Sequence, residues 1–395
     1  MTVDDVSVLR CPISGKDLRF ANADEIAELR ADIAKQTLVH LDGSPVGQLF
    51  NGFLRTVEGH VYYPILDNVF ILLSDFAILP VAERRSYAVH LTPAATRAVM
   101  HFYDRTGWRK TDSGVFHDAD INEDFREVSR EYIHRCHLRL NDHLPKHGKY
   151  LLDVASGPIQ YDEYLTYSAN FERRICCDVS YEALKVAASR LGNKGIYIQG
   201  DITNLPLKDG AVDAFVSLHT VYHVPAEKQI LAFRELERVT GDGGSGVVVY
   251  SWGDHAWGHK LGKRCRALAG LSGRLRTLLR PFVPDAWVKW LKRGSVAVVT
   301  QPRFTGKLAA SQYSFHAYDF GWYRKSVATS GQWTLRVWRG VSPEFLKRRI
   351  PDNIFGSLVL ALIHRVEGFF PTLLGRIGQY PMFVFRKPSH SASHR

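Results

Sequence analysis

From residue 149 onward, short apolar runs alternate with amphipathic segments. Seven of the runs have the composition of buried strands, and segments with helical spacing separate several of them. This alternation predicts an α/β fold with a doubly wound, mostly parallel, seven-stranded Rossmann-like sheet, whose ligand crevice lies at the carboxyl ends of the strands. Strands are predicted at 150–154, 174–178, 195–200, 214–218, 246–252, 333–341 and 381–387, and helices at 181–191, 226–239 and 318–331.

The rest of the pattern sets the domain boundaries. A polar helix at 24–36 and short apolar strands around Pro64 predict a small α+β module, and one-faced helical periodicity at 122–144 predicts a helical lead-in to the sheet. Two further segments interrupt the sheet pattern. The predicted parts are a module at 1–80, a helical lead-in at 81–148, a sheet domain at 149–387 with helical insertions at 253–312 and 351–380, and a disordered tail at 388–395.

The second insertion contains the apolar stretches 358–362 and 369–374. We expect these stretches to close the core or to form a lid over an apolar ligand. No apolar stretch of the chain reaches the roughly 20 residues that a membrane-spanning helix needs.

The first insertion indicates an anionic partner. The chain has 51 Lys and Arg against 40 Asp and Glu, a formal net charge of +11, and residues 260–307 hold twelve of these cations with Asp285 as their one acid. Leu275, Leu278 and Leu279 have helical spacing among the cations, which suits the surface of an anionic membrane. We therefore expect 259–307 to contact such a surface. Nucleic acid is the less favoured partner, because no recognised nucleic-acid module accompanies the charge.

The amino-acid composition limits the structural class of the protein and its cellular compartment. With 45% hydrophobic and 23% charged residues, the 395-residue chain has a substantial core, which excludes disordered and collagen-like classes. The five cysteines never have Cys-x-x-Cys spacing, so we expect neither a disulfide framework nor a metal site. The first ten residues lack the apolar region of a secretory signal. We expect a cytoplasmic protein, peripheral at the inner face of a membrane if 259–307 binds there, and leave its oligomeric state open.

The turn after the first predicted strand of the sheet lies in Leu151-Leu-Asp-Val-Ala-Ser-Gly-Pro-Ile-Gln160. A dinucleotide fingerprint needs Gly-x-Gly-x-x-Gly, but Ala155 and Gln160 stand at two of the three glycine positions, so pyrophosphate binding is disfavoured. A P-loop is excluded because no Gly-Lys-Ser/Thr follows the strand. The turn therefore fits a ligand without a pyrophosphate.

Carboxylates follow three successive predicted strands, at Asp153, Asp178 and Asp201. In βαβ nucleotide folds, an acid on the order of 20 residues after the first turn hydrogen-bonds ribose hydroxyls, and Asp178 lies near that spacing. Any one of these acids could simply cap a helix or a turn. Three of them in this order favour a ligand site.

These motifs resemble the class I S-adenosylmethionine-dependent methyltransferases, and among them the branch of the ubiquinone and menaquinone biosynthetic enzymes. The resemblance covers about 149–252 and includes Cys177-Asp-Val-Ser-Tyr-Glu-Ala-Leu184, Gly200-Asp-Ile-Thr-Asn-Leu-Pro-Leu207 and Ser217-Leu-His-Thr-Val-Tyr-His-Val224. The start at Cys11-Pro-Ile-Ser14 resembles the zinc-ribbon-like module of several methyltransferases. Because Ser14 stands where that module has a cysteine, we expect a metal-free scaffold.

The resemblance implies S-adenosyl-L-methionine as the cofactor and methyl transfer to an oxygen or carbon of a small-molecule or lipid-linked acceptor, including a glycan. It implies contacts of Asp153 and Gly157 with the methionine portion, of Asp178 with the ribose, of Asp201 and Ile202 with the adenine, and a place for His219 beside the cofactor. The family usually has glycine where Ala155 and Ile159 stand. The full candidate cofactor set is Asp153, Ala155, Ser156, Gly157, Asp178, Val179, Asp201, Ile202, Leu218 and His219.

Transfer to a hydroxyl needs a group that takes its proton. His219 and His223 lie just past a predicted strand end and are candidate catalytic bases, although packing explains His223 equally well. Tyr222 is a candidate for orienting the acceptor, and we expect the region 161–167 to contribute acceptor specificity together with the first insertion.

Two other functions stay open. The departures from glycine would fit a catalytically silent S-adenosylmethionine-binding scaffold, and the net charge would fit a nucleic-acid methyltransferase. The second is disfavoured, because Ser217-Leu-His219 stands where amine-methylating enzymes have Asn or Asp followed by Pro-Pro-Tyr.

Overall fold

The computed structural model describes residues 2–47, 50–112, 114–256 and 315–389. Most of the first predicted insertion, 253–312, lies outside the described residues, as does the candidate membrane segment 259–307. Of the predicted tail 388–395, only the first two residues are described.

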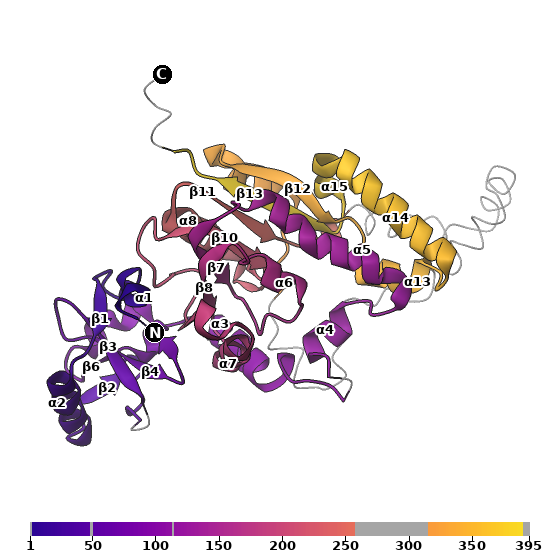
Figure 1. The fold of residues 1–395 in the computed structure, drawn as a ribbon. Coiled ribbons are helices and arrows are strands. Elements are labelled where there is room, and N and C mark those ends of the chain that lie inside the picture. Colours follow the sequence, from indigo (N-terminus) through magenta and orange to yellow (C-terminus); the bar gives the residue numbers. More distant parts are fainter. Residues whose placement is uncertain (1, 48–49, 113, 257–314, 390–395) are drawn as a thin grey trace, which may run out of the picture.

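The described residues form one thirteen-stranded, mixed sheet (Figure 1). Its main path runs β1-β3-β4-β5-β9-β8-β7-β10-β11-β13-β12. From β5 to β11 every neighbouring pair is parallel, and β13 is antiparallel to both of its neighbours. The strands after residue 147 are β7 (Gly148–Val154), β8 (Phe171–Asp178), β9 (Gly195–Gln199), β10 (Val212–Leu218), β11 (Thr240–Val249), β12 (Trp333–Arg339) and β13 (Tyr380–Arg386).

All seven predicted strands of the sheet domain are present, which confirms an α/β fold with a mostly parallel sheet. The hydrophobic pattern was sufficient to predict these strands because β7 to β11 are buried over most of their length, and each contains an apolar run of at least three residues. The sheet does not stop at seven strands, however, because it continues into the N-terminal module.

The junction between the module and the sheet domain is a parallel strand pair. β5 (Val69–Ile71) aligns Phe70 with Ile198 of β9 and is buried along its whole length. β5 leaves β4 through a two-residue turn at Asp67 and Asn68, whose φ angles of 47° and 61° are the left-handed pair of a tight hairpin. The module elements are α1 (Val3–Ser7), β1 (Leu18–Phe20), α2 (Ala23–Ala34), β2 (Leu38–His40), β3 (Gly52–Thr56), β4 (Tyr62–Leu66) and β6 (Ile78–Pro80).

The resemblance of the module to a metal-free zinc ribbon stays a prediction. Cys11 is buried, and its Sγ lies 3.3 Å from the Tyr63 Oη. In the part of the chain that the structure describes, no group of three or more His, Cys, Asp or Glu side chains is arranged to hold a metal ion.

Helices cover both faces of the sheet domain. The predicted helix at 122–144 is wrong in its bounds, because α4 ends at Asn122, Glu123 is extended, and α5 begins at Glu127. The break has a physical cause, since the buried Glu123 side chain pairs with Arg339 of β12. The helices of this part are α3 (Ala94–Phe102), α4 (His117–Asn122), α5 (Glu127–Leu138), α6 (Glu163–Thr166), α7 (Tyr181–Leu191), α8 (Gln229–Val239), α12 (Phe320–Trp322), α13 (Pro343–Arg349), α14 (Ile354–Phe369) and α15 (Pro371–Ile377).

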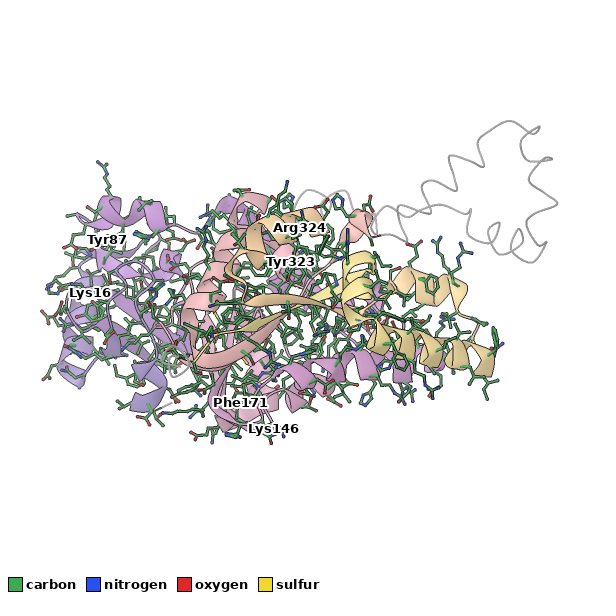
Figure 2. The ribbon with its side chains drawn as sticks, turned by 90° about the horizontal axis from the view of Figure 1, so that it is seen from above. Lys16, Tyr87, Lys146, Phe171, Tyr323 and Arg324 are labelled. Atoms are coloured by element: carbon green, nitrogen blue, oxygen red, sulfur yellow. The ribbon has the colours of Figure 1, made fainter. Side chains whose placement is uncertain are left out.

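The module and α14 lie at opposite ends of the molecule. Figure 2, turned from the view of Figure 1, shows Lys16 and Tyr87 at one end, whereas the yellow α14 extends past the sheet at the other. Between them Tyr323, in a π-helical turn at Tyr323–Val327, packs its ring 4.5 Å from that of Phe383 on β13.

Candidate functional site

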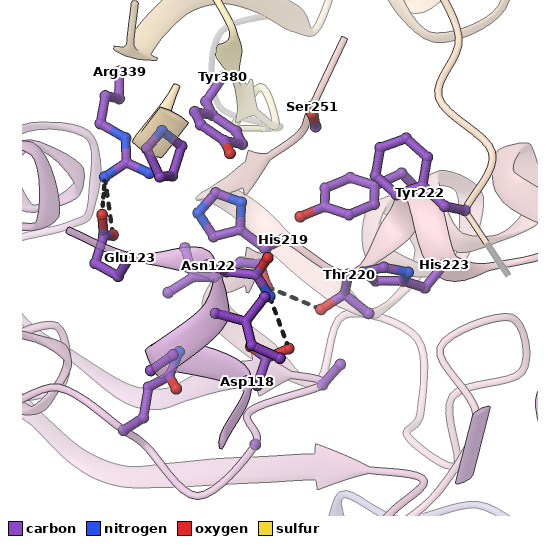
Figure 3. A pocket seen from close by; sticks show the side chains of 18 of the residues that line it. Asp118, Asn122, Glu123, His219, Thr220, Tyr222, His223, Ser251, Arg339 and Tyr380 are labelled. Atoms are coloured by element: carbon purple, nitrogen blue, oxygen red, sulfur yellow. Dashed lines mark hydrogen bonds and ion pairs between the residues drawn. The ribbon is translucent and has the colours of Figure 1, made fainter. Parts of the chain in front are cut away.

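A cavity of about 1170 Å³ opens at the carboxyl ends of β7, β8 and β10. One part of its wall comes from the loop after β7 and the end of β8. The other part comes from α4, the end of β10, α13 and the paired strands β12 and β13 (Figure 3). The cavity therefore lies in the crevice that the strand pattern predicts for a ligand.

The loop after β7 keeps a conformation that normally requires glycine. Ala155, Gly157 and Ile159 have φ angles of 53°, 55° and 53°, all in the left-handed region. The structure thus explains why the resemblance has glycine at positions 155 and 159. Ala155 and Gly157 line the cavity, whereas the Ile159 side chain is fully buried in the core.

Asp178 at the end of β8 is the best-supported cofactor residue. Its carboxylate lines the cavity and accepts two backbone hydrogen bonds, from Gly157 N at 2.8 Å and from Ser180 N at 2.8 Å. One lone pair on each oxygen is left for a ligand donor. Burial raises the pKa of Asp178 to about 6, although both backbone hydrogen bonds act against this rise.

The other two predicted acids are placed differently. Asp153 lies at the cavity wall, but its Oδ2 accepts from the Arg174 Nε at 3.1 Å and from Arg174 Nη2. Asp201 accepts from the backbone N and the hydroxyl of Thr203, at 2.8 and 2.9 Å. Neither Asp201 nor Ile202 is on the cavity wall, so their predicted adenine contacts stay predictions.

The wall near Asp178 suits a nucleoside. Val99, Phe102, Tyr103 and Val179 give it apolar and aromatic surface for a base. Two buried polar atoms of the wall, Trp108 Nε1 and Gln160 Oε1, have no hydrogen-bond partner among the described residues and so offer one donor and one acceptor. The residues present therefore fit S-adenosylmethionine.

His219 occupies the middle of the cavity (Figure 3). It follows β10 with a φ of 59°, and its ring lies 4.6 Å from that of Trp338 and 5.1 Å from that of Tyr380. Burial, followed by the charge of Arg339, lowers the pKa of His219 well below its usual 6.5. The imidazole is therefore neutral at pH 7 and can accept a proton.

The remaining predicted residues lie on the same wall. Tyr222, His223, Ser156, Val179 and Leu218 line the cavity, and the rings of Tyr222 and His223 are 4.5 Å apart. From the predicted specificity region 161–167, Tyr161 and Tyr164 also line it.

The sequence reasoning missed charged residues of the wall, among them Asp118, Glu123 and Arg339. Arg339 Nη1 donates to both Glu123 oxygens at 2.7 and 2.9 Å, and both side chains are buried (Figure 3). Burial raises the pKa of Asp118 to about 6. No local pattern marks these residues, because α4 and β12 are far apart in the sequence.

Comparison with known families agrees with this site. Residues 152–248 match the model of a methyltransferase domain. The segment from β7 to β11 is thus similar to methyltransferase domains, and the match supports the predicted cofactor, S-adenosylmethionine. Comparison with curated proteins gives no significant match.

Solved methyltransferase structures resemble the chain weakly. Geranyl diphosphate C-methyltransferase from Streptomyces coelicolor A3(2) is 12% identical, with a TM-score of 0.41, over 75% of this chain and 99% of its own. Phosphoethanolamine N-methyltransferase 2 from Haemonchus contortus is 12% identical, with a TM-score of 0.43, over 93% of this chain and 75% of its own.

Proposed function

We propose that the protein is a class I S-adenosylmethionine-dependent methyltransferase that acts on an oxygen or carbon of a small-molecule or lipid-linked acceptor, including a lipid-linked glycan. The observation that supports this most is the shared cavity. It places the ribose candidate Asp178 and the neutral His219 on the walls of one volume, with Arg339 and Glu123 beyond them. A cofactor and an acceptor would therefore meet beside His219.

The chain's own residues would act by positioning and by proton transfer. S-adenosylmethionine, when bound, supplies an electrophilic methyl group on a sulfonium. His219 would accept the proton of an acceptor hydroxyl on a ring nitrogen, because burial holds the imidazole in its neutral form. Asp118 is the second base that the cavity offers, because its pKa of about 6 lies just below neutral pH.

The acceptor would lie against the far wall of the cavity. Trp338 and Tyr380 line it there, and the Arg339 guanidinium carbon lies 4.9 and 5.0 Å from the centres of their rings. Aromatic faces beside a hydrogen-bonded ion pair suit a ligand with apolar surface and hydroxyl groups, such as a sugar or a hydroxylated ring. These rings would also exclude water from the methyl group.

For location, we propose a cytoplasmic protein that can bind peripherally to the inner face of an anionic membrane. The sequence of 259–307 supports this through its excess of cations.

The test is calorimetric titration of S-adenosylmethionine and S-adenosylhomocysteine into the full chain, with Asp178→Ala and a matched control. Asp213→Ala is the control, because Asp213 Oδ2 also accepts two backbone N–H groups, from Lys149 and Tyr150, yet Asp213 is not on the cavity wall. We expect micromolar binding by the wild type and by Asp213→Ala, with at least a tenfold loss in Asp178→Ala.

No binding by the wild type would contradict the proposal. Binding by the wild type would justify an acceptor screen that begins with lipid-linked glycans and quinone precursors. Cofactor binding without methyl transfer to any acceptor would favour the catalytically silent scaffold instead.

A further inference from the structure

We propose that the exposed face of α14 and α15 docks onto an anionic lipid bilayer. This surface, here called the apolar ridge, is separate from the segment 259–307. Its residues are exposed by between 40% and 81% of their surface, which is unusual for side chains of this kind, and they are Ile354, Phe355, Leu358, Leu362, Val366, Phe369, Phe370 and Leu373.

The helix α14 exposes many of its apolar side chains and buries an acid, whereas an ordinary surface helix buries its apolar face. Its inner face carries Glu367, which is 1% exposed and accepts hydrogen bonds from the Tyr132 hydroxyl at 2.7 Å, from Gly340 N at 2.7 Å and from Arg139 Nη2 at 3.1 Å. A helix repeat of about 100° per residue places Leu358 and Leu362 opposite Glu367 and the buried Leu360. The buried acid therefore fixes the helix with its apolar side outward.

The apolar ridge does not serve the protein's own core or cavity. Its stretches were predicted to close the core or to cover the ligand. Leu360 of the first stretch is buried in the core, but the ridge side chains around it are exposed, and no residue of α14 or α15 is on the cavity wall. Among the described residues, the core-closing prediction therefore holds only for the inner side of α14, and the prediction that these stretches cover the ligand is wrong.

Length argues for a helix that lies along a membrane. The 16 residues of α14 span about 24 Å, less than the roughly 30 Å of a hydrocarbon core. Among the described residues, no single helix meets the length and hydropathy required to cross a bilayer, and α14 with α15 does so only as a pair bent by 108°. Phe369 and Phe370 stand at this bend, where their exposed rings can enter the lipid interface.

Charge selects an anionic bilayer over a second copy of the chain. Arg365 lies on the same side of α14 as Leu358 and Leu362, Arg376 lies on α15, and Lys347 lies on the preceding helix α13. Two copies paired through this face would bring their cations together, whereas lipid phosphates would complement them. The long arginine stems can reach the headgroups while Leu and Phe side chains enter the interface.

The ridge begins beside the cavity. α13 contributes Lys347 and Arg348 to the cavity wall and ends five residues before α14 begins, so docking would hold this part of the wall near the headgroups. The idea that an acceptor enters from the membrane depends on the proposed methyltransferase function. The docking of α14 and α15 onto the membrane does not depend on that function.

Co-sedimentation of the full chain with vesicles tests the docking. The vesicles are phosphatidylcholine alone or phosphatidylcholine mixed with phosphatidylglycerol. The variant Leu358→Glu/Leu362→Glu is compared with Val57→Glu/Val89→Glu, which replaces two apolar side chains that are 52% and 85% exposed in the N-terminal half. We expect the wild type and the control to bind anionic vesicles, and the ridge variant to bind at least ~10-fold more weakly.

Absence of wild-type binding, or equal binding by the ridge variant, would overturn the proposal. A dimer in sedimentation equilibrium that only the ridge variant loses, without vesicle binding, would overturn it in favour of self-association. Cofactor titration of the same variants separates the two proposals, because docking leaves cofactor affinity unchanged and a failed methyltransferase assignment leaves vesicle binding unchanged.

Discussion

Removing either partner of the Asp153–Arg174 ion pair should destabilise the protein strongly. Arg174 has no exposed surface, and Asp153 is 3% exposed. Arg174 also donates from Nη1 to the Tyr164 carbonyl, so its guanidinium has partners on two sides. Asp153→Ala leaves this cation buried with its counter-charge gone, which typically costs about 3–5 kcal/mol.

Arg174→Met should cost less, because an unpaired carboxylate can take up a proton and become neutral, whereas a guanidinium stays charged. In the double variant neither charge remains buried, so the two losses should overlap. We expect a coupling energy of about 2 kcal/mol or more from the free energies of unfolding of the four proteins in urea. The control pair Glu182 and Lys185 has half-exposed side chains and should couple by less than about 0.5 kcal/mol.

Losses that add to within about 0.5 kcal/mol would refute this reasoning. The same variants also test the role that the family resemblance implies for Asp153. Arg174→Met keeps the carboxylate, so unchanged cofactor affinity in Arg174→Met together with a loss in Asp153→Ala would indicate direct contact with the cofactor. Equal losses in both variants would indicate that Asp153 acts by holding the loop.

Three further predictions concern the cavity and its loop. If the ionised Asp178 binds the ribose, its pKa of about 6 implies that calorimetric cofactor affinity is level above about pH 7 and falls below pH 6, and a flat profile would contradict this. Asp118→Asn should raise the free energy of unfolding by about 1–2 kcal/mol at pH 7, because the buried carboxyl resists ionisation only in the folded state. That gain should vanish below about pH 4, where the carboxyl is protonated in both states; a gain that persists there would exclude ionisation as its cause. Ala155→Gly should raise the free energy of unfolding in urea by up to about 1 kcal/mol, because glycine adopts the positive φ without strain. Ile159→Gly should lower the free energy of unfolding, because it removes a buried side chain. A lower free energy of unfolding in both variants would show that glycine does not relieve the backbone strain.

The sequence was sufficient to predict the parallel strands of the sheet. It was insufficient to predict contacts between residues that lie far apart in the chain. Strands such as β9 could be predicted because burial on both faces produces a short apolar run, here at 196–198. The same apolar composition occurs in α14, where it is exposed, so hydropathy alone could not tell the two situations apart. The Glu123–Arg339 pair joins residues 216 positions apart, and such a pair leaves no local periodicity to detect.

The departures from glycine in the β7 loop do not change the shape of the candidate cofactor site. If Ala155 and Ile159 had forced the loop into another shape, the backbone N of Gly157 would not reach Asp178, yet that hydrogen bond is 2.8 Å long. Both residues keep the left-handed conformation, and the larger Ile159 side chain points into the core and not into the cavity. The cost of the substitutions is therefore backbone strain, of about 1–2 kcal/mol at each site, and not the loss of ligand volume. Such strain is tolerated where the surrounding structure fixes the conformation, which is common at functional sites. A loop that keeps this geometry without glycine is better explained by a ligand that requires it than by a site that has lost its ligand.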